Sequence, residues 1–229
     1  MDFGEVMRTF FDDKENRVQF FENDDFPKKV ESLTQMYQLY SAGIKGLRAK
    51  LEILDSEFML GYDHNPIHHI EYRLKSPTSI QEKLDRKSLP LTVENVWKHV
   101  NDVAGVRVIC SFLEDIYHVS GLLLAQSDVS LVRKKDYIVT PKDSGYRSLH
   151  LVVAIPIYLS SRAEHVQVEV QFRTIAMDFW ASLEHQLKYK SHKDIPQNLR
   201  DELLECSNSI SKLDRQMQGI HQKINMENK

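Results

Sequence analysis

Residues 165–173, HVQVEVQFR, alternate strictly between apolar and polar side chains. Successive side chains of a β-strand point to opposite faces, so this segment has one apolar face and one polar face. The apolar face consists of Val166, Val168, Val170 and Phe172, and the polar face of Gln167, Glu169, Gln171 and Arg173. The helical segment that follows is heavily apolar and should lie back on the sheet, which makes a wholly solvated polar face less favourable than a functional one. Glu169 is therefore a candidate metal ligand or general base.

Four more segments have the composition of strands, at residues 70–75, 106–112, 130–138 and 149–157. Helical patterns separate some of them, at 79–87, 92–103, 115–126 and 174–190. Ser79, with Glu82 three residues later, is expected to open the first of these helices as a capping box. The sequence thus predicts an α/β (α+β) core, with a mixed β-sheet of about five strands flanked by helices.

Two segments with helical spacing flank this core. From Leu33 to Phe58, and again from Leu199 to Ile224, apolar residues alternate spacings of three and four. Such a seam packs either on the chain's own core or against another subunit. Because two seams of this length exceed what one small core easily covers, we favour a homo-oligomer. We expect an N-terminal helical arm over 1–62, a core over 63–192, and a C-terminal helix over 193–229 that contacts another subunit.

The composition excludes several classes of protein. With 229 residues, the chain suits one compact domain with helical extensions. It has no run of about 18 apolar residues that would cross a membrane, and its charged start is unlike a signal peptide. Two cysteines are too few for a disulfide framework, which favours the cytoplasm. The net charge of -3 argues against a protein that coats DNA, so any phosphate site must be a local basic patch.

One such patch lies in residues 70–87. Arg73 and Lys75 share one face of the predicted strand, and Lys83, one helical turn beyond Ser79, can lie on the same side. With the free N–H groups at the start of the helix, these cations could bind a triphosphate. The alternative is a solvated charged face, with Ser79 a simple N-cap.

Asp102 lies at a chain reversal, between a helical pattern and the strand at 106–112. A carboxylate at the rim of a sheet is typical of metal ligands in nucleotide enzymes, and an ordinary turn residue is the alternative. Arg107, within the strand, would be unfavourable to bury unless an anion or Asp102 lay beside it.

The one long loop, 139–148, and the strand before it place basic side chains around an aromatic ring. The basic residues are Arg133, Lys134, Lys135, Lys142 and Arg147, and the ring is Tyr146. This combination suits a nucleotide, with phosphates on the cations and the base on the ring. His150, which follows, could contact a substrate or cap the loop. The histidines at 64, 68 and 69 lack a zinc spacing and are expected to be surface residues.

Four segments, taken together and in order, resemble the synthetase domain of the RelA/SpoT homologue family over about residues 70–190: RLKSPTSIQEKL, DVAGVRVIC, RKKDYIVTPKDSGYRSLH and VEVQFRTIAMDFWASLEHQLKYK. The resemblance implies a nucleotidyltransferase-like synthetase domain in a small, stand-alone alarmone synthetase. Such an enzyme is a GTP pyrophosphokinase of the stringent response, which transfers the β,γ-diphosphate of ATP to the 3′-hydroxyl of GTP or GDP and releases AMP. Since the sequence has no His-Asp dipeptide and ends at residue 229, we expect synthesis without hydrolysis.

The resemblance also implies a role for each candidate residue. Asp102 and Glu169 would be catalytic and hold Mg²⁺, with Glu169 also activating the attacking hydroxyl. The residues that bind ATP would be Arg73, Lys75, Ser79 and Lys83, with Arg107 in support. Those that bind GTP or GDP would be Lys135, Lys142, Tyr146, His150 and Gln171, with Tyr146 stacked on guanine. The helical arms resemble those of family members that form homotetramers. The basic segment 133–136 resembles a family segment linked to acceptor preference and weakly favours GTP being accepted at least as well as GDP.

Two other functions stay open at this point. A nucleotidyltransferase using the same carboxylates would release pyrophosphate from ATP rather than AMP. A non-catalytic nucleotide or RNA binder would have little need of both Asp102 and Glu169, although the basic loop would suit single-stranded RNA as a side activity.

Overall fold

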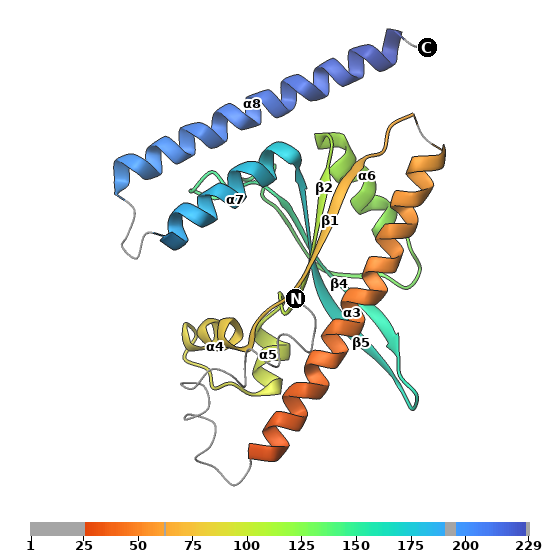
Figure 1. The fold of residues 1–229 in the computed structure, drawn as a ribbon, viewed down its shortest axis with the longest axis vertical. Coiled ribbons are helices and arrows are strands. Elements are labelled where there is room, and N and C mark those ends of the chain that lie inside the picture. The colour runs from red at the N-terminus through yellow and green to blue at the C-terminus, as the bar shows by residue number, and fades with distance from the viewer. Residues whose placement is uncertain (1–25, 62, 191–195, 228–229) are drawn as a thin grey trace.

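The alternating segment is the central strand of a five-stranded mixed sheet. The computed structural model describes residues 26–61, 63–190 and 196–227, with side chains described over 31–61, 63–187 and 196–227 (Figure 1). The strands are β1 (Ile67–Leu74), β2 (Ala104–Cys110), β3 (Ser130–Asp136), β4 (Leu149–Tyr158) and β5 (Ala163–Thr174). Their order is β1-β2-β5-β4-β3, in which only β2 and β5 run parallel. The predicted fold class is confirmed, while residues 1–25 of the expected N-terminal arm lie outside the described residues.

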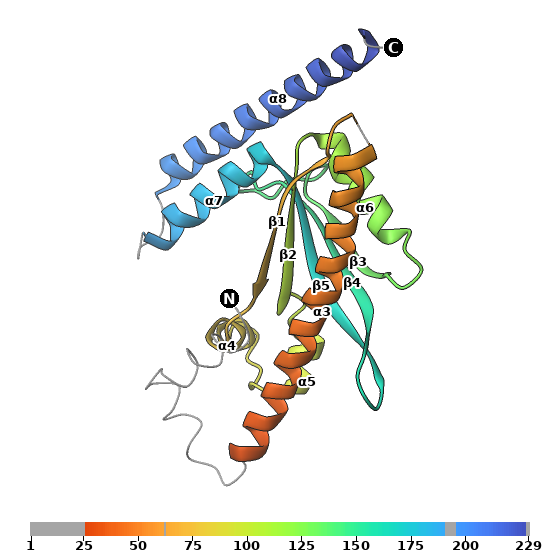
Figure 2. The same cartoon turned by 45° about the vertical axis from the view of Figure 1, so that its right-hand side comes forward.

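The apolar face of the sheet is covered by two helices, α3 (Phe26–Gly61) and α6 (Leu113–Leu124) (Figures 1 and 2). The apolar seam predicted in the N-terminal arm is part of this core. Its members Leu33, Tyr37, Tyr40, Leu47, Leu51 and Phe58 are all buried. The expectation that two such seams exceed one small core is wrong for α3, because the apolar face of a five-stranded sheet is long enough to cover this helix.

Two glycines allow α3 to lie directly on the central strands. A Cβ atom at Gly43 would come within 2.8 Å of Val166 Cγ1, and one at Gly46 within 3.1 Å of Ile155 Cδ1. The helix backbone thus contacts valine and isoleucine side chains of β5 and β4 without intervening atoms. This close approach fixes the height of α3 above the sheet.

The polar face carries shorter helices: α4 (Pro77–Asp85) and α5 (Val93–His99) at one end, and α7 (Ile175–Lys190) at the other. Two sequence expectations are wrong here. Ser76 is the N-cap of α4, and its hydroxyl accepts the backbone N–H of Ser79 at 3.2 Å. The helix begins earlier than predicted because Pro77, with its fixed φ, suits the first helical position. Helix α5 ends at His99, so that Asp102 lies in the turn before β2.

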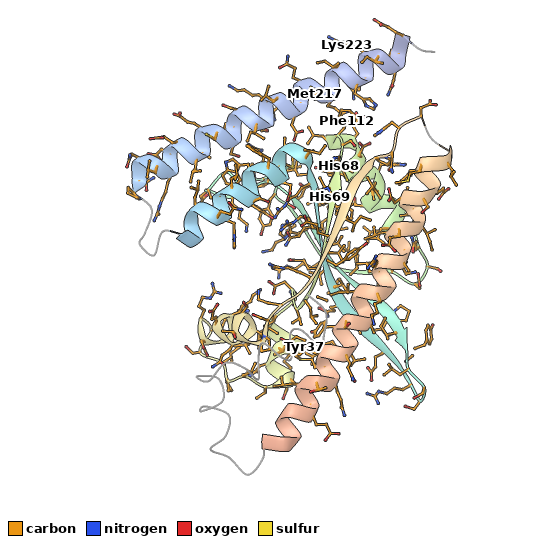
Figure 3. The ribbon with its side chains drawn as sticks, viewed as in Figure 1. Tyr37, His68, His69, Phe112, Met217 and Lys223 are labelled. Atoms are coloured by element: carbon orange, nitrogen blue, oxygen red, sulfur yellow. The ribbon has the colours of Figure 1, made fainter. Side chains whose placement is uncertain are left out.

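Helix α8 (Gln197–Glu227) crosses over α7 and the start of α6 (Figures 1 and 2). Its inward side is polar: Ser207, Ser211, Asp214 and Gln218 are buried. Thr174 Oγ1 donates to Asp214 Oδ2 at 2.6 Å, and the N–H of Glu114 donates to Gln218 Oε1 at 3.1 Å. Phe112 lies beneath the helix (Figure 3), where its ring stacks on His221 at 4.1 Å between centroids.

The predicted apolar seam of this helix faces away from the core. Leu199, Leu213, Met217, Ile220 and Ile224 are 43–58% exposed. Helix α8 is therefore amphipathic in the inverted sense, with polar groups against its own chain and apolar groups outside. None of the described helices is long and apolar enough to cross a membrane.

Replacing Gly43 by valine should lower the free energy of unfolding by about 2 kcal/mol or more, since the new side chain would overlap Val166. The matched control is Gly121→Val in α6, where a Cβ atom meets nothing within 4 Å and the change should stay within about 0.5 kcal/mol. Urea denaturation of both variants measures the difference. Equal midpoints would show that α3 does not rest on β5 as described.

Candidate active site

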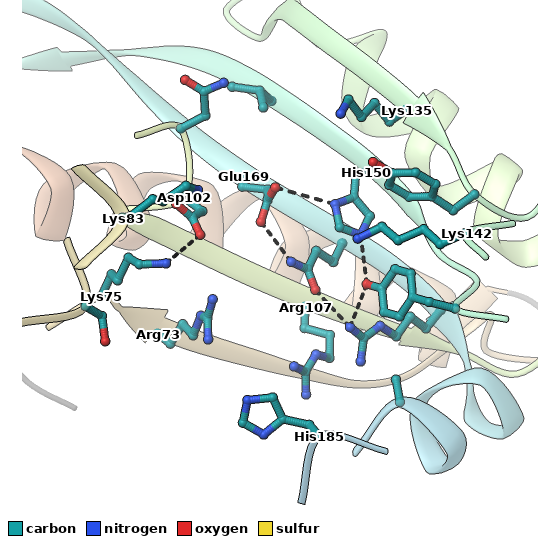
Figure 4. A pocket seen from close by; sticks show the side chains of 18 of the residues that line it. Arg73, Lys75, Lys83, Asp102, Arg107, Lys135, Lys142, His150, Glu169 and His185 are labelled. Atoms are coloured by element: carbon teal, nitrogen blue, oxygen red, sulfur yellow. Dashed lines mark hydrogen bonds and ion pairs between the residues drawn. The ribbon is translucent and has the colours of Figure 1, made fainter. Parts of the chain in front are cut away.

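A large pocket lies on the polar face of the sheet, between α4 and α5 at one end and the loop before β4 at the other (Figure 4). Its volume of about 1140 Å³ is above the usual range for one small ligand, which leaves room for two nucleotides. Eleven of its lining residues are Lys or Arg and four are Asp or Glu, so a chain with net charge -3 has concentrated cations here. All the predicted site residues line it: Arg73, Lys75, Ser79, Lys83, Asp102, Arg107, Lys135, Lys142, Tyr146, His150, Glu169 and Gln171.

At one end of the pocket, two lysines converge on one carboxylate. Lys75 Nζ donates to Asp102 Oδ2 and Lys83 Nζ to Asp102 Oδ1, both at 2.7 Å. Burial would raise the pKa of Asp102, but the hydrogen bonds and charges of the two lysines outweigh it and lower the pKa to about 2. The backbone of Lys75 is held by the Tyr37 hydroxyl, which donates to its carbonyl at 2.9 Å. Asp102 is thus ionised, and it holds both ammonium groups at the pocket wall.

The two arginines near this end differ in their surroundings. Arg73 is exposed on the pocket side of β1, beside Gly105. Arg107 does not pair with Asp102, which was one of the partners expected from the sequence. Its NH1 donates to Glu71 Oε2 at 2.8 Å and lies 3.4 Å from Asp178 Oδ1. The reason is geometric: Asp102 lies before β2, whereas Arg107 lies farther along the strand, opposite Glu71 of β1.

Glu169 lies between the two ends (Figure 4). Its Oε2 accepts the side-chain amide of Gln171 at 2.8 Å, and its Oε1 lies 3.4 Å from His150 Nδ1. Burial would raise its pKa, but hydrogen bonding with His150 and Gln171 lowers it below the usual value. The carboxylate is therefore charged near neutral pH and points into the pocket from the middle of the central strand.

The opposite end combines aromatic rings with cations. Lys142 Nζ lies 4.7 Å from the ring centroid of Tyr146 and 4.8 Å from that of Tyr137. The hydroxyl of Tyr146 is 2.8 Å from His150 Nε2. Lys135 faces the pocket from β3, opposite His150. Sequence reasoning missed Tyr137, whose only signal was its place after the basic strand.

Sequence reasoning also left Arg173 out of the site. This arginine is 5% exposed, and it donates to Asp178 Oδ1 at 2.8 Å, Tyr146 Oη at 2.8 Å and Gln171 Oε1 at 3.1 Å. It thereby joins α7, the loop and β5. The signal that could have identified it was the alternation of β5 itself, since Arg173 follows Glu169 and Gln171 on the polar face.

The acidic groups of the pocket fit a magnesium ion shared with a substrate. Magnesium in phosphate-transfer sites is usually held by one or two carboxylates together with substrate phosphates rather than by an all-protein cage. Asp102 and Glu169 supply two carboxylates, close enough that the charge of Asp102 acts to raise the pKa of Glu169. Among the described residues there is no cluster of three or more His, Cys, Asp or Glu that would hold a metal alone.

A cluster of cations at one end, an aromatic ring and a histidine at the other, and ionised carboxylates between them are typical of nucleotide-binding enzymes of phosphate transfer, and this is the class that the site indicates. Comparison with known proteins specifies the family. Residues 72–194 match the family described as a region found in RelA / SpoT proteins, and the chain belongs to this family.

Individual relatives cover most of the chain. GTP pyrophosphokinase YwaC of Bacillus subtilis is 44% identical over 201 residues, which are 88% of this chain and 96% of the relative. The structure of B. subtilis small alarmone synthetase 1 bound to its product pppGpp is similar with a TM-score of 0.75 and 39% identity, covering 81% of this chain and 94% of that one. A structure of the same enzyme bound to AMPCPP gives a TM-score of 0.68 and 34% identity, covering 82% and 96%.

Replacing Asp102 by asparagine should strengthen metal-free binding of inorganic tripolyphosphate by roughly tenfold, because the anion no longer competes with the carboxylate for Lys75 and Lys83. Isothermal titration calorimetry in EDTA measures this affinity. Asp85→Asn, on exposed α4 outside the pocket, removes the same charge and serves as control. If both variants bind equally, Asp102 does not hold the lysines in solution.

Proposed function

We propose that this chain is a GTP pyrophosphokinase that transfers the β,γ-diphosphate of ATP to the 3′-hydroxyl of GTP or GDP, making (p)ppGpp and AMP in the stringent response. It acts as a synthetase without hydrolase activity. The observation that carries the proposal is one pocket with Glu169 in its middle. Lys75 and Lys83, which suit a polyphosphate, lie at one end, and Tyr146 and Lys142 lie at the other. A relative 44% identical is named a GTP pyrophosphokinase, and a similar structure was solved with pppGpp.

At the ATP end, Lys75 and Lys83 bind the triphosphate, with Arg73 and Ser79 beside them and Arg107 in support. The lysines move from Asp102 to the phosphate oxygens, an exchange of one anion for another that leaves no ammonium group unpaired. The β-phosphorus of ATP then lies toward Glu169. Transfer of a diphosphate requires in-line placement and neutralisation of charge more than covalent chemistry, and this end supplies both.

At the acceptor end, the guanine base stacks on Tyr146, while Lys135 and Lys142 bind the phosphates of GTP or GDP. His150 and Gln171 contact the same nucleotide. Gln171 also donates a hydrogen bond to Glu169, and His150 lies beside it, so a nucleotide held by these two residues has its ribose next to this carboxylate. Glu169 accepts the hydrogen of the 3′-hydroxyl and aims the oxygen at the β-phosphorus of ATP.

Asp102 and Glu169 would hold Mg²⁺. When bound, the ion would withdraw electron density from the phosphate oxygens and offset the negative charge that develops during transfer. We further propose a cytoplasmic location, which suits two cysteines that are both free, Cys110 buried and Cys206 exposed.

Purified protein with γ-labelled ATP, Mg²⁺ and GTP or GDP should produce labelled guanosine penta- or tetraphosphate together with an equal amount of AMP. Glu169→Gln should lower the rate by about 10²- to 10⁴-fold, because an amide cannot accept the proton. Glu164→Gln, the same change on the same strand but outside the pocket, should keep the full rate. Release of free pyrophosphate in place of AMP would identify a nucleotidyltransferase, and untouched ATP in folded protein would refute both reactions.

We also propose that the chain forms a homotetramer through the exposed apolar seam of α8. Met217→Glu should lower the mass measured by light scattering toward 26.8 kDa, that of one chain, because a charge would be buried in the contact. Gln216→Glu adds the same charge at the neighbouring exposed position and should leave the assembly intact. A wild-type mass of one chain would refute the proposal.

A further inference from the structure

The C-terminal helix reaches the acceptor end of the pocket through one buried hydrogen bond. Ser207 Oγ, on the inward side of α8, donates to the backbone carbonyl of Gly145 at 2.6 Å. Ser207 is only 4% exposed, so no solvent competes for this carbonyl. The residue after Gly145 is Tyr146, the ring proposed to stack on guanine. A helix far from the reacting atoms thus contacts the peptide that carries the base-binding side chain.

The loop at this point has a shape that depends on the contact. Gly145 has φ of +86°, a conformation that other residues rarely adopt. A Cβ atom there would come within 2.7 Å of Ser207 Cβ and 3.1 Å of Leu204 Cδ1. The turn is closed by two further bonds, from the N–H of Gly145 to the carbonyl of Lys142 at 2.8 Å and from the N–H of Lys142 to the carbonyl of Tyr146 at 3.2 Å. The loop and helix are therefore fitted to each other at the backbone.

Helix α8 is itself anchored to the core on both sides of Ser207. Trp180 Nε1 of α7 donates to the carbonyl of Leu203 at 3.0 Å, and Thr174, at the end of β5, donates to Asp214 at 2.6 Å. Ser207 is in this way fixed relative to the central strand that carries Glu169. The tip of the Tyr146 side chain is held independently, by Arg173 at 2.8 Å. The position of the Tyr146 ring is consequently set at two points: α8 holds the backbone before it, and Arg173 of β5 holds its hydroxyl.

We infer that Ser207 is a positioning residue for the acceptor nucleotide: its hydrogen bond to Gly145 holds the turn at 142–146 so that Tyr146 and Lys142 face the pocket before the nucleotide arrives. This inference rests on the proposed function, in which these two side chains bind GTP or GDP. Without the bond, the buried carbonyl of Gly145 has no donor and the turn samples other conformations, which the acceptor must select against on binding. The ATP end, built from β1, α4 and the turn at Asp102, is held instead by α3, whose Tyr37 hydroxyl donates to the carbonyl of Lys75, and it is unaffected.

The first arm of the test compares Ser207→Ala with Ser211→Ala. Ser211 lies one turn farther along the same buried side of α8, is 7% exposed, and accepts a hydrogen bond from Arg215 instead of contacting the loop. Steady-state kinetics should give Ser207→Ala a KM for GTP and GDP raised roughly fivefold, as expected for loss of one hydrogen bond, with the KM for ATP unchanged. Ser211→Ala should leave both constants at the wild-type values.

The second arm needs no activity. Hydrogen exchange of the nucleotide-free proteins should be roughly fivefold faster at the amides of Lys142 and Gly145 in Ser207→Ala than in Ser211→Ala, with the amides of β4 and β5 unchanged. Faster exchange spread over the whole sheet, or equal rises in the KM of ATP and acceptor, would mean general destabilisation and overturn the inference. Identical behaviour of the two alanine variants would overturn it as well. If the wild-type protein makes no alarmone, the proposed function fails, and the exchange arm still decides whether Ser207 fixes the turn.

Discussion

The two-faced character of β5 is the constraint on which the rest of the structure depends. One face of this central strand is buried under α3, whose glycine backbone lies against Val166, and the other forms the floor of the pocket. A shift of one residue in its pairing with β2 and β4 would put Glu169 in the core and a valine in the pocket. The unfavourable burial of that carboxylate and the loss of the α3 contact both oppose the shift. The interactions that fix the register of the sheet therefore also direct Glu169 into the pocket.

Both central carboxylates of the pocket are paired with neighbouring side chains. Lys75 and Lys83 are paired with Asp102, and Glu169 lies beside Gln171 and His150 at the other side of the pocket floor. Cations kept close together repel one another, and a carboxylate between them relieves that repulsion. In the function proposed above, a polyphosphate would take the place of Asp102 beside the two lysines and would leave this carboxylate to a metal ion. Such an exchange of partners would prepare the site for two anionic substrates without a change in the backbone.

Much of the fold and of the candidate site could be predicted from the sequence, because strand alternation and helical spacing depend directly on which side chains are buried. The period-2 pattern of β5 predicted its two faces and placed Glu169 and Gln171 on the pocket side. The other pocket residues were predicted from the basic segment 70–87, the turn at Asp102, the loop 139–148 and the resemblance to the family. The start of α4 was misplaced because the local signal of Pro77 was not used. The partner of Arg107, in contrast, depends on which strand lies opposite, and no local rule gives that. The packing of α8 was inaccessible for the same reason. The spacing of α8 showed an apolar stripe, but only the fold reveals that this stripe faces away from the core. The contacts of Arg173 with Tyr146 and of Tyr137 with Lys142 likewise come from the fold.

The inverted packing of α8 has a consequence for how its sequence can change. A surface helix ordinarily accepts most substitutions on its outer side, since only the inner stripe is constrained. In α8 the inner stripe includes polar groups matched to specific partners, such as Asp214 to Thr174, where an apolar replacement would take a hydrogen bond from a buried hydroxyl. The outer stripe carries exposed apolar residues from Leu199 to Ile224. With the outer stripe covered by another subunit in the proposed tetramer, only two narrow strips between these faces would accept substitutions freely. Helix α8 should then diverge among relatives more slowly than its peripheral position suggests.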